Sequence, residues 1–238
     1  MFRATKKVWL LALPLLAAWP AAGRASDNDT NTSRLFERPV SIQEISASSN
    51  PDPVDAIRCT YYPDFMIRES GTDSPAPNDA VFVPGVHPAC SAAGPATGER
   101  VVATANYSLL GKIGRFVLFS ATDPNGAVPF MVLDAATGRT IYTDATAADH
   151  GIDDVAADQR TLHLQYMRGF NASCSIMQNP TGCWAKLVAE GKIPQAMTPP
   201  APSPQLCVAS YKQANATPDD PSVVTYPVDM TIEASGRV

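Results

Sequence analysis

The stretch RVVATANYSLLGKIGRFVLFSATDPNGAVPFMVLDAATGRTIYT, residues 100–143, decides the fold of this chain. It contains four runs rich in β-branched and aromatic residues, at 100–107, 115–122, 128–134 and 139–143. Each separator between these runs holds a glycine, and Asn125-Gly126 is a strong signal for a tight turn. Because two parallel neighbours need a connection of roughly a dozen residues, these short separators predict antiparallel strands.

Both faces of the predicted strands are apolar. Val117 and Phe119 alternate with Leu118, and Phe130 alternates with Met131. Such strands are covered on both sides, as in a sandwich or barrel. Similar short runs occur at 57–62, 65–68, 80–83, 161–167, 206–212 and 223–232, and a helix is expected over 180–191. We therefore predict an all-β or β-dominated α+β fold, an antiparallel sandwich or barrel of about nine or ten short strands with one or two short helices.

The ends of the chain differ in composition from this centre. Residues 1–25 combine a basic start, an uncharged run from Val8 to Ala22 and small residues before Ser26, which is the architecture of a secretory signal peptide. Residues 26–54 are polar and predict a flexible N-terminal arm, in which the apolar cluster from Val40 to Ile45 could dock on the domain. The remainder, 55–238, is predicted to be a single β-rich domain with a Pro-rich connection over 194–204.

The overall composition limits the possible partners. Hydrophobic residues make up 45% of the 238 and charged residues 17%, which excludes a disordered polyelectrolyte. Removal of residues 1–25, which carry four basic and no acidic residues, leaves 14 basic and 23 acidic residues and a formal net charge of −9. That charge disfavours nucleic acid and anionic membranes, and it favours a basic partner. No stable membrane insertion is expected after signal cleavage, because no later apolar run reaches about 18 residues.

All five cysteines follow the predicted signal peptide. An exported chain meets an oxidising compartment, so disulfides are expected. Cys174 and Cys183 enclose eight residues that include Pro180 and Gly182, and we predict this bridge first. A second bridge is predicted among Cys59, Cys90 and Cys207, with Cys59–Cys90 favoured by proximity in the sequence. The leftover cysteine would be a buried free thiol, a site of intermolecular pairing or a reactive nucleophile.

Motifs for catalysis are absent from the sequence. It holds no GxSxG, HExxH, Walker A or dinucleotide-binding motif. The densest polar segment is 144–158, read as a loop, where Asp149, Asp153 and Asp154 could supply oxygen ligands to a cation such as calcium. No other cofactor is indicated. Tyrosine and arginine are enriched at binding hot spots, and they occur together at Tyr61, Tyr62, Arg58, Arg68 and Arg168.

Three functions remain open on these grounds. The favoured one is a secreted or periplasmic, non-enzymatic binding protein that recognises a protein or envelope component. The first alternative is a secreted hydrolase or cation-dependent enzyme that uses His150 with the acidic segment 144–158. The second is a structural envelope component, in which the unpaired cysteine would form covalent dimers.

Overall fold

The computed structural model describes most of the chain after residue 34. The described residues are 35–46, 56–70, 79–91, 97–104, 107–121, 126–148, 150–194, 197 and 200–238. The predicted signal peptide lies outside them. Of the predicted N-terminal arm the structure describes 35–46, and the Pro-rich connection is described at 194, 197 and 200–204.

The first sheet, sheet A, is built from consecutive strands. In spatial order they are β1 (Ser41–Ser46), β2 (Ala56–Tyr61), β3 (Phe65–Ser70), β4 (Asp79–Pro84) and β5 (Arg100–Thr104). Every neighbouring pair is antiparallel. β1 belongs to the segment expected as an arm, so part of that segment is a sheet edge.

The second sheet, sheet B, holds the longer strands. They are β6 (Tyr107–Ile113), β7 (Phe116–Ala121), β8 (Ala127–Asp134), β9 (Arg139–Ala147), β10 (Ile152–Ala157), β11 (Thr161–Asn171) and β12 (Val223–Glu233). β6 to β9 form a meander, whereas β11 pairs with β12 along its whole length and with β10 along its first half. β9 meets β11 only near its end, where Arg168 lies opposite Thr146.

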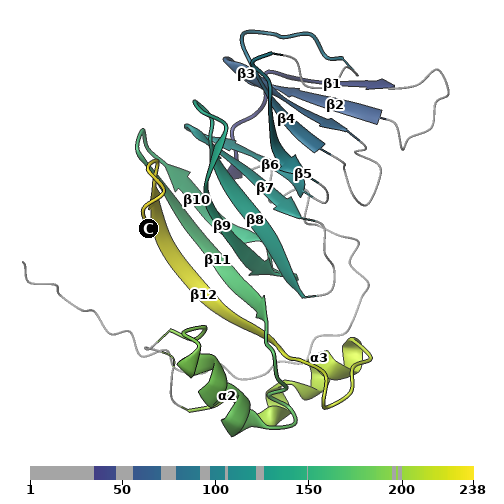
Figure 1. Cartoon of the computed structure of the whole chain (residues 1–238), viewed down its shortest axis with the longest axis vertical. Helices are drawn as coiled ribbons and strands as arrows, with labels where there is room; N and C mark the ends of the chain where they lie inside the picture. The colour runs from purple at the N-terminus through teal and green to yellow at the C-terminus, as the bar shows by residue number, and fades with distance from the viewer. Residues whose placement is uncertain are drawn as a thin grey trace, which may run out of the picture.

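The alternating side chains of β7 pack into two different clusters of the core. Val117 and Phe119 pack with residues of sheet A that include Phe82. Phe116 and Leu118 face the other way and pack against the β10–β12 half of sheet B. Figure 1 shows sheet A above the longer, curved strands of sheet B. The prediction of a strand-dominated, antiparallel, sandwich-like fold is confirmed.

Four local expectations are wrong. The run 100–107, expected as one strand, is divided: β5 ends at Thr104 in sheet A, and β6 begins at Tyr107 in sheet B. Residues 110–114, expected as a separator, mostly belong to β6, because a register shift at Gly111 lets the strand continue to Ile113. The segment 144–158, expected as a loop, supplies the end of β9 and all of β10. The segment 206–212, expected as a strand, begins in the short 3-10 helix η3 (Pro204–Leu206) and continues into helix α3 (Val208–Gln213).

The predicted helix is present as α2 (Pro180–Ala189). The Asn179 side chain accepts a hydrogen bond from the Gly182 amide at 3.0 Å, which caps the first turn as expected. α2 and α3 lie together at the end of sheet B farthest from sheet A (Figure 1). Among the described residues, none of the helices is both long and apolar enough to cross a membrane.

Both predicted disulfides are present. Cys59–Cys90 ties β2 to the segment after β4, and Cys174–Cys183 ties the chain leaving β11 to α2. Cys207 is a free thiol of intermediate exposure beside α3. One disulfide therefore cross-links sheet A to the segment after β4, and the other cross-links the helical end of sheet B.

Candidate functional site

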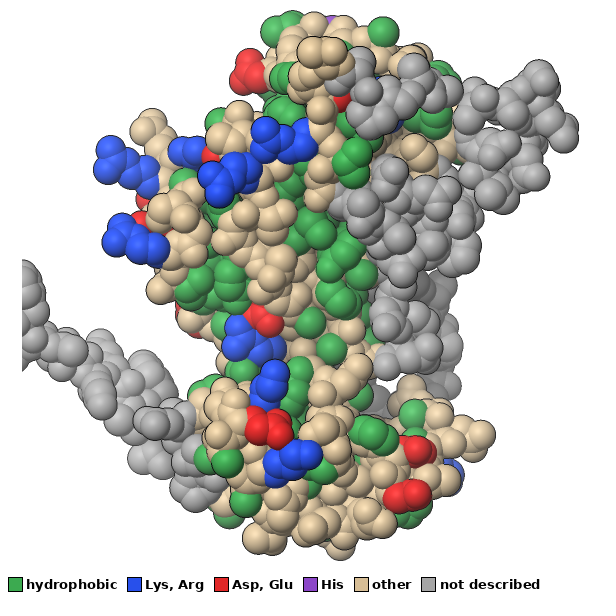
Figure 2. Space-filling model, in the orientation of Figure 1, with side chains coloured by type: hydrophobic (Ala, Val, Ile, Leu, Met, Phe, Trp, Pro, Cys, Tyr) green, Lys and Arg blue, Asp and Glu red, His purple; other side chains and the backbone are tan. Residues whose placement is uncertain are grey.

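A pocket lies where sheet B meets the chain that follows α2. Its volume is about 290 Å³. Strand β9 contributes Tyr142, Thr143 and Asp144, β11 contributes Arg168, Gly169 and Phe170, β12 contributes Tyr226, and the chain after α2 contributes Gly191 and Lys192. Basic and acidic side chains gather on this part of the surface, at the junction of sheet B and α2 (Figure 2).

Strand pairing brings these side chains together. Arg168 lies directly opposite Tyr226 in the β11–β12 ladder and opposite Thr146 of β9. At Gly169 the backbone of β9 comes so close that an added Cβ would lie 2.8 Å from the carbonyl oxygen of Thr146 and 2.9 Å from backbone atoms of Ala147. A glycine is therefore needed for β9 to approach β11 and form this wall of the pocket.

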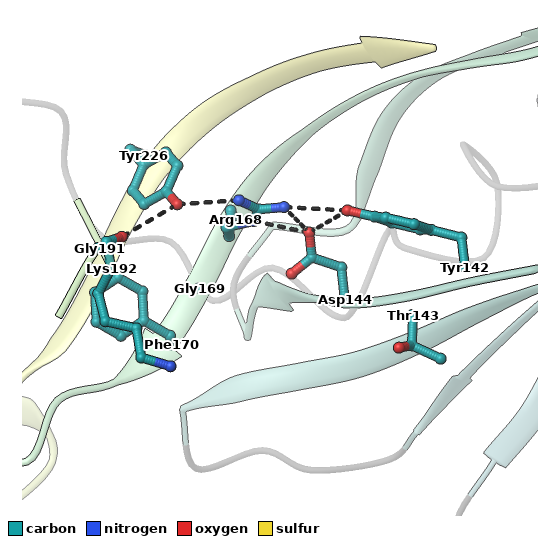
Figure 3. A pocket seen from close by; sticks show the side chains of 9 residues that line it. All are labelled: Tyr142, Thr143, Asp144, Arg168, Gly169, Phe170, Gly191, Lys192 and Tyr226. Carbon is teal, nitrogen blue, oxygen red and sulfur yellow. Dashed lines mark hydrogen bonds and ion pairs between the residues drawn. The ribbon is translucent and has the colours of Figure 1, made fainter. Parts of the chain in front are cut away.

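Arg168 is the centre of a hydrogen-bond network. Its Nε donates to the Asp144 carboxylate at 2.7 Å, and its Nη2 forms an ion pair with the same carboxylate. On the other side, Nη1 donates to the Tyr226 hydroxyl at 3.1 Å. Asp144 also accepts from the hydroxyls of Tyr142, at 2.7 Å, and Tyr166. Figure 3 shows Arg168 between Tyr226 on one side and Asp144 with Tyr142 on the other.

The network holds its titratable groups in one protonation state. Burial acts to raise the pKa of Asp144, but hydrogen bonds from Tyr166, Arg168 and Tyr142 outweigh it, and the pKa lies below the ordinary value. Burial raises the pKa of Tyr142, and burial with the Asp144 hydrogen bond raises that of Tyr166. Burial opposes the charge on Arg168, yet hydrogen bonds to Tyr226 and Asp144 raise its pKa. Near neutral pH the carboxylate and the guanidinium are charged and the two phenols are neutral.

Only one of the residues predicted for binding lines this pocket. That residue is Arg168, whose side chain is 29% exposed. Tyr61 and Tyr62 are 6% and 3% exposed and pack in the core around sheet A. Arg68 is 3% exposed and pairs with Glu99, and Arg58 lies opposite the buried Glu69 on β3. Three of these side chains are thus buried in or beside sheet A and Arg58 is half-buried on β2, so none of the four lines this pocket.

The predicted cation site falls partly outside the described residues, because Asp149 is not among them. Asp153 and Asp154 are exposed on β10, while Asp144 belongs to the pocket network. Within the described ranges, no three His, Cys, Asp or Glu side chains are grouped so that they could hold a metal ion. The acidic segment is thus divided between two strands.

The histidines are also distributed over the fold. His87 follows β4 and lies beside the Tyr61 ring, with the ring centres 6.0 Å apart. His150 is exposed in the connection between β9 and β10, and His163 on β11 pairs with Asp229 at 2.7 Å. The enzymatic alternative paired His150 with acidic neighbours, but the carboxylate of that segment that reaches the pocket, Asp144, is bound to Arg168.

Sequence reasoning missed most of the pocket. Tyr142 and Asp144 lie two residues apart on β9, as do Tyr166 and Arg168 on β11. A polar residue and a tyrosine at a spacing of two share one face of a strand, so this repeat was a usable signal. Lys192 and Tyr226 are brought in by the α2 connection and the β12 pairing, which no local pattern reveals.

Comparison of the chain with protein-family models, with curated proteins and with solved structures finds no match in any of the three.

Proposed function

We propose that this chain is an exported, non-enzymatic binding protein that recognises a protein or envelope component at the pocket around Arg168. The observation that carries the proposal is the pocket itself, in which one network fixes the orientation of Arg168, Asp144 and Tyr142. A preformed concave site with a few fixed polar groups is the usual form of a binding site. Because side chains from paired strands build it, a ligand meets groups that are already ordered.

The protonation states favour binding over acid–base catalysis. A general acid or base works best when its pKa lies near the operating pH. The pKa of Asp144 is lowered and the pKa values of Tyr142 and Tyr166 are raised, so these groups keep their protons or their charge near neutrality. They can orient a ligand, and they are poorly suited to exchanging protons with it.

Export to an oxidising compartment is part of the proposal. Residues 1–25 have signal-peptide architecture, and the two disulfides suit an extracytoplasmic or extracellular compartment. Mass spectrometry of the protein recovered outside the cytoplasm should find a chain that starts at Ser26, with Cys207 as its one alkylatable cysteine. Recovery of the full-length chain from the cytoplasm with five reactive thiols would contradict export.

The binding test uses a variant that fills the pocket. Thr143 is exposed and lines the pocket, so Thr143→Trp should block it without removing a member of the network. Thr140→Trp is the matched control, because Thr140 is exposed on the same strand but outside the pocket lining. The immobilised proteins are incubated at low salt with envelope and host-surface extracts, and the retained components are quantified. Wild type and Thr140→Trp should retain the same component, and Thr143→Trp should lose it. No retention by wild type, or equal retention by Thr143→Trp, would overturn the proposal.

A further inference from the structure

The pocket carries one positive charge that no nearby carboxylate balances. Arg168 and Asp144 form one pair, and Lys186 and Glu190 of the neighbouring helical end form another at 3.9 Å. Lys192 is exposed at the pocket and forms no ion pair within the described part of the chain. The local balance is therefore one excess positive charge, on a chain whose mature form is acidic overall.

The guanidinium of Arg168 also keeps donor capacity. An arginine has five N–H groups. The Nε hydrogen and the two Nη2 hydrogens point to the Asp144 carboxylate and the Tyr142 hydroxyl. Nη1 uses one of its two hydrogens to donate to the Tyr226 hydroxyl. The second Nη1 hydrogen has no acceptor among the described residues. An incoming anion can take this hydrogen bond without breaking the Asp144 pair.

The rest of the pocket suits a small, partly apolar body. Phe170, Tyr142 and Tyr226 contribute three aromatic side chains to its walls. In Figure 3, Phe170 and Lys192 lie together on one side and Thr143 lies across from them. A volume of about 290 Å³ is just below the usual range of about 300–1,000 Å³ for ligand pockets, which suits a ligand group no larger than about one amino-acid residue.

From these observations we propose that the pocket binds the C-terminal residue of a polypeptide partner, with the free Arg168 N–H donating to its α-carboxylate. The exposed Lys192 side chain, whose ammonium lies beside Phe170 and points away from Arg168 in Figure 3, turns toward the carboxylate when the ligand binds. The inference rests on the proposed binding function and names the group that is recognised. A single terminal carboxylate satisfies the single excess charge. An acidic polysaccharide would offer a carboxylate too, but its repeated charges would be repelled by a mature chain with a net charge of −9.

Lys192 has a structural role that the test must separate from binding. It follows the C-terminus of α2, where a cation is favourable because the helix dipole is negative there. Its backbone N–H donates to the Leu187 carbonyl at 2.9 Å, and this bond does not depend on the side chain. Replacement of the side chain should therefore change binding much more than folding.

The experiment compares ligands that differ only in the carboxylate. Three ligands are titrated separately into the mature protein: acetyl-alanyl-leucine, its C-terminal amide, and galacturonate. Binding is followed by calorimetry and by NMR chemical-shift changes of the Lys192 and Phe170 backbone amides. We expect the peptide acid to bind at least about tenfold more tightly than the amide. Galacturonate also carries one carboxylate but has no apolar side chain to contact the aromatic walls, so it should bind more weakly than the peptide acid. Higher salt should weaken the binding of the acid.

Variants then locate the carboxylate. Lys192→Ala should weaken binding of the peptide acid by about tenfold, while its melting temperature stays near that of wild type. Lys186→Ala removes the same charge from the preceding helix and should change the affinity by less than about twofold. Equal binding of acid and amide, tighter binding of galacturonate, or full affinity in Lys192→Ala would each overturn the inference. If no probe binds at millimolar concentration but retention in extracts is still lost in Thr143→Trp, the ligand class is wrong and the binding function stands.

Discussion

Arg68 of sheet A and Arg168 of sheet B look alike in the sequence and end in opposite environments. Each lies on a strand near aromatic residues, and each pairs with a carboxylate, Glu99 for the first and Asp144 for the second. The Arg68 side chain is 3% exposed, whereas that of Arg168 is 29% exposed. The difference shows that exposure is set by what covers each strand. β3 is central in sheet A, and β11 at Arg168 ends beside a pocket.

The largest expected effect comes from removing the buried arginine. Arg68→Ala removes a guanidinium that is 3% exposed together with its ion pair to Glu99, and truncation of one partner of a buried ion pair costs about 3–5 kcal/mol. Arg168→Ala should cost about 1–2 kcal/mol, because solvent and the neighbouring tyrosine hydroxyls can still solvate Asp144. Urea unfolding of both variants measures the two free energies. Equal costs would show that the two arginines do not differ as their burial indicates.

The disulfides allow the same two regions to be compared. Cys59–Cys90 closes a separation of 31 residues in sheet A, and Cys174–Cys183 closes one of 9 at the helical end. By loop-closure entropy, replacing both cysteines by serine should cost about 4 kcal/mol for the first pair and about 3 kcal/mol for the second. Chemical denaturation of the two double variants gives the order. A larger loss of unfolding free energy in the Cys174–Cys183 variant would contradict this order and show that the disulfide near the pocket stabilises the fold more.

Gly169 tests how closely the strands must approach at the pocket. Gly169→Ala places a methyl group against backbone atoms of Thr146 and Ala147, which cannot move without separating β9 from β11. Overpacking of this kind costs about 1–3 kcal/mol. Gly151→Ala is the control, since an added Cβ there meets nothing within 4 Å. Thermal unfolding should separate the two variants, and an unchanged melting temperature for Gly169→Ala would refute the close approach.

The two sheets should also respond to pH in opposite directions. Burial raises the pKa of Glu69 in sheet A, against smaller lowering effects of the Leu109 hydrogen bond and Arg58. The stability that this group contributes is present at low pH and is lost as the pH rises through its raised pKa. The pKa of Asp144 is lowered, so its contribution is present above the ordinary value of 3.8 and is lost as the pH falls through the lowered pKa. Glu69→Gln should remove the first dependence and Asp144→Asn the second, as measured by urea unfolding from pH 2 to 8.

Local sequence signals predicted the parts of the fold that depend on neighbouring residues. Three features could be predicted because the interacting residues are close in the chain. They are the alternating strand around Val117 and Phe119, the Asn179 cap of α2, and the short Cys174–Cys183 loop. The pocket depends on pairings across long separations, such as that of Arg168 with Tyr226. The proximity of arginine to tyrosine was used to predict binding residues in both sheets. In sheet A the predicted residues belong to the core, and in sheet B one of them lines the pocket, because the sequence does not show which face of a strand is covered.

The smallest expected effect concerns Cys207, which tests whether the helical end is a surface for covalent association. The thiol is only partly exposed, and it packs beside the cluster that contains Ile176 and Leu187. Burial raises its pKa, so less thiolate is present near neutral pH and alkylation should be slower than for a small free thiol. Cys207→Ser should change the free energy of unfolding by less than about 1 kcal/mol, and the oxidised protein should run as a monomer on a non-reducing gel. A dimer that disappears in Cys207→Ser would instead favour the structural envelope alternative. It would mean that a second chain packs beside the cluster that contains Phe170, a residue that also lines the pocket.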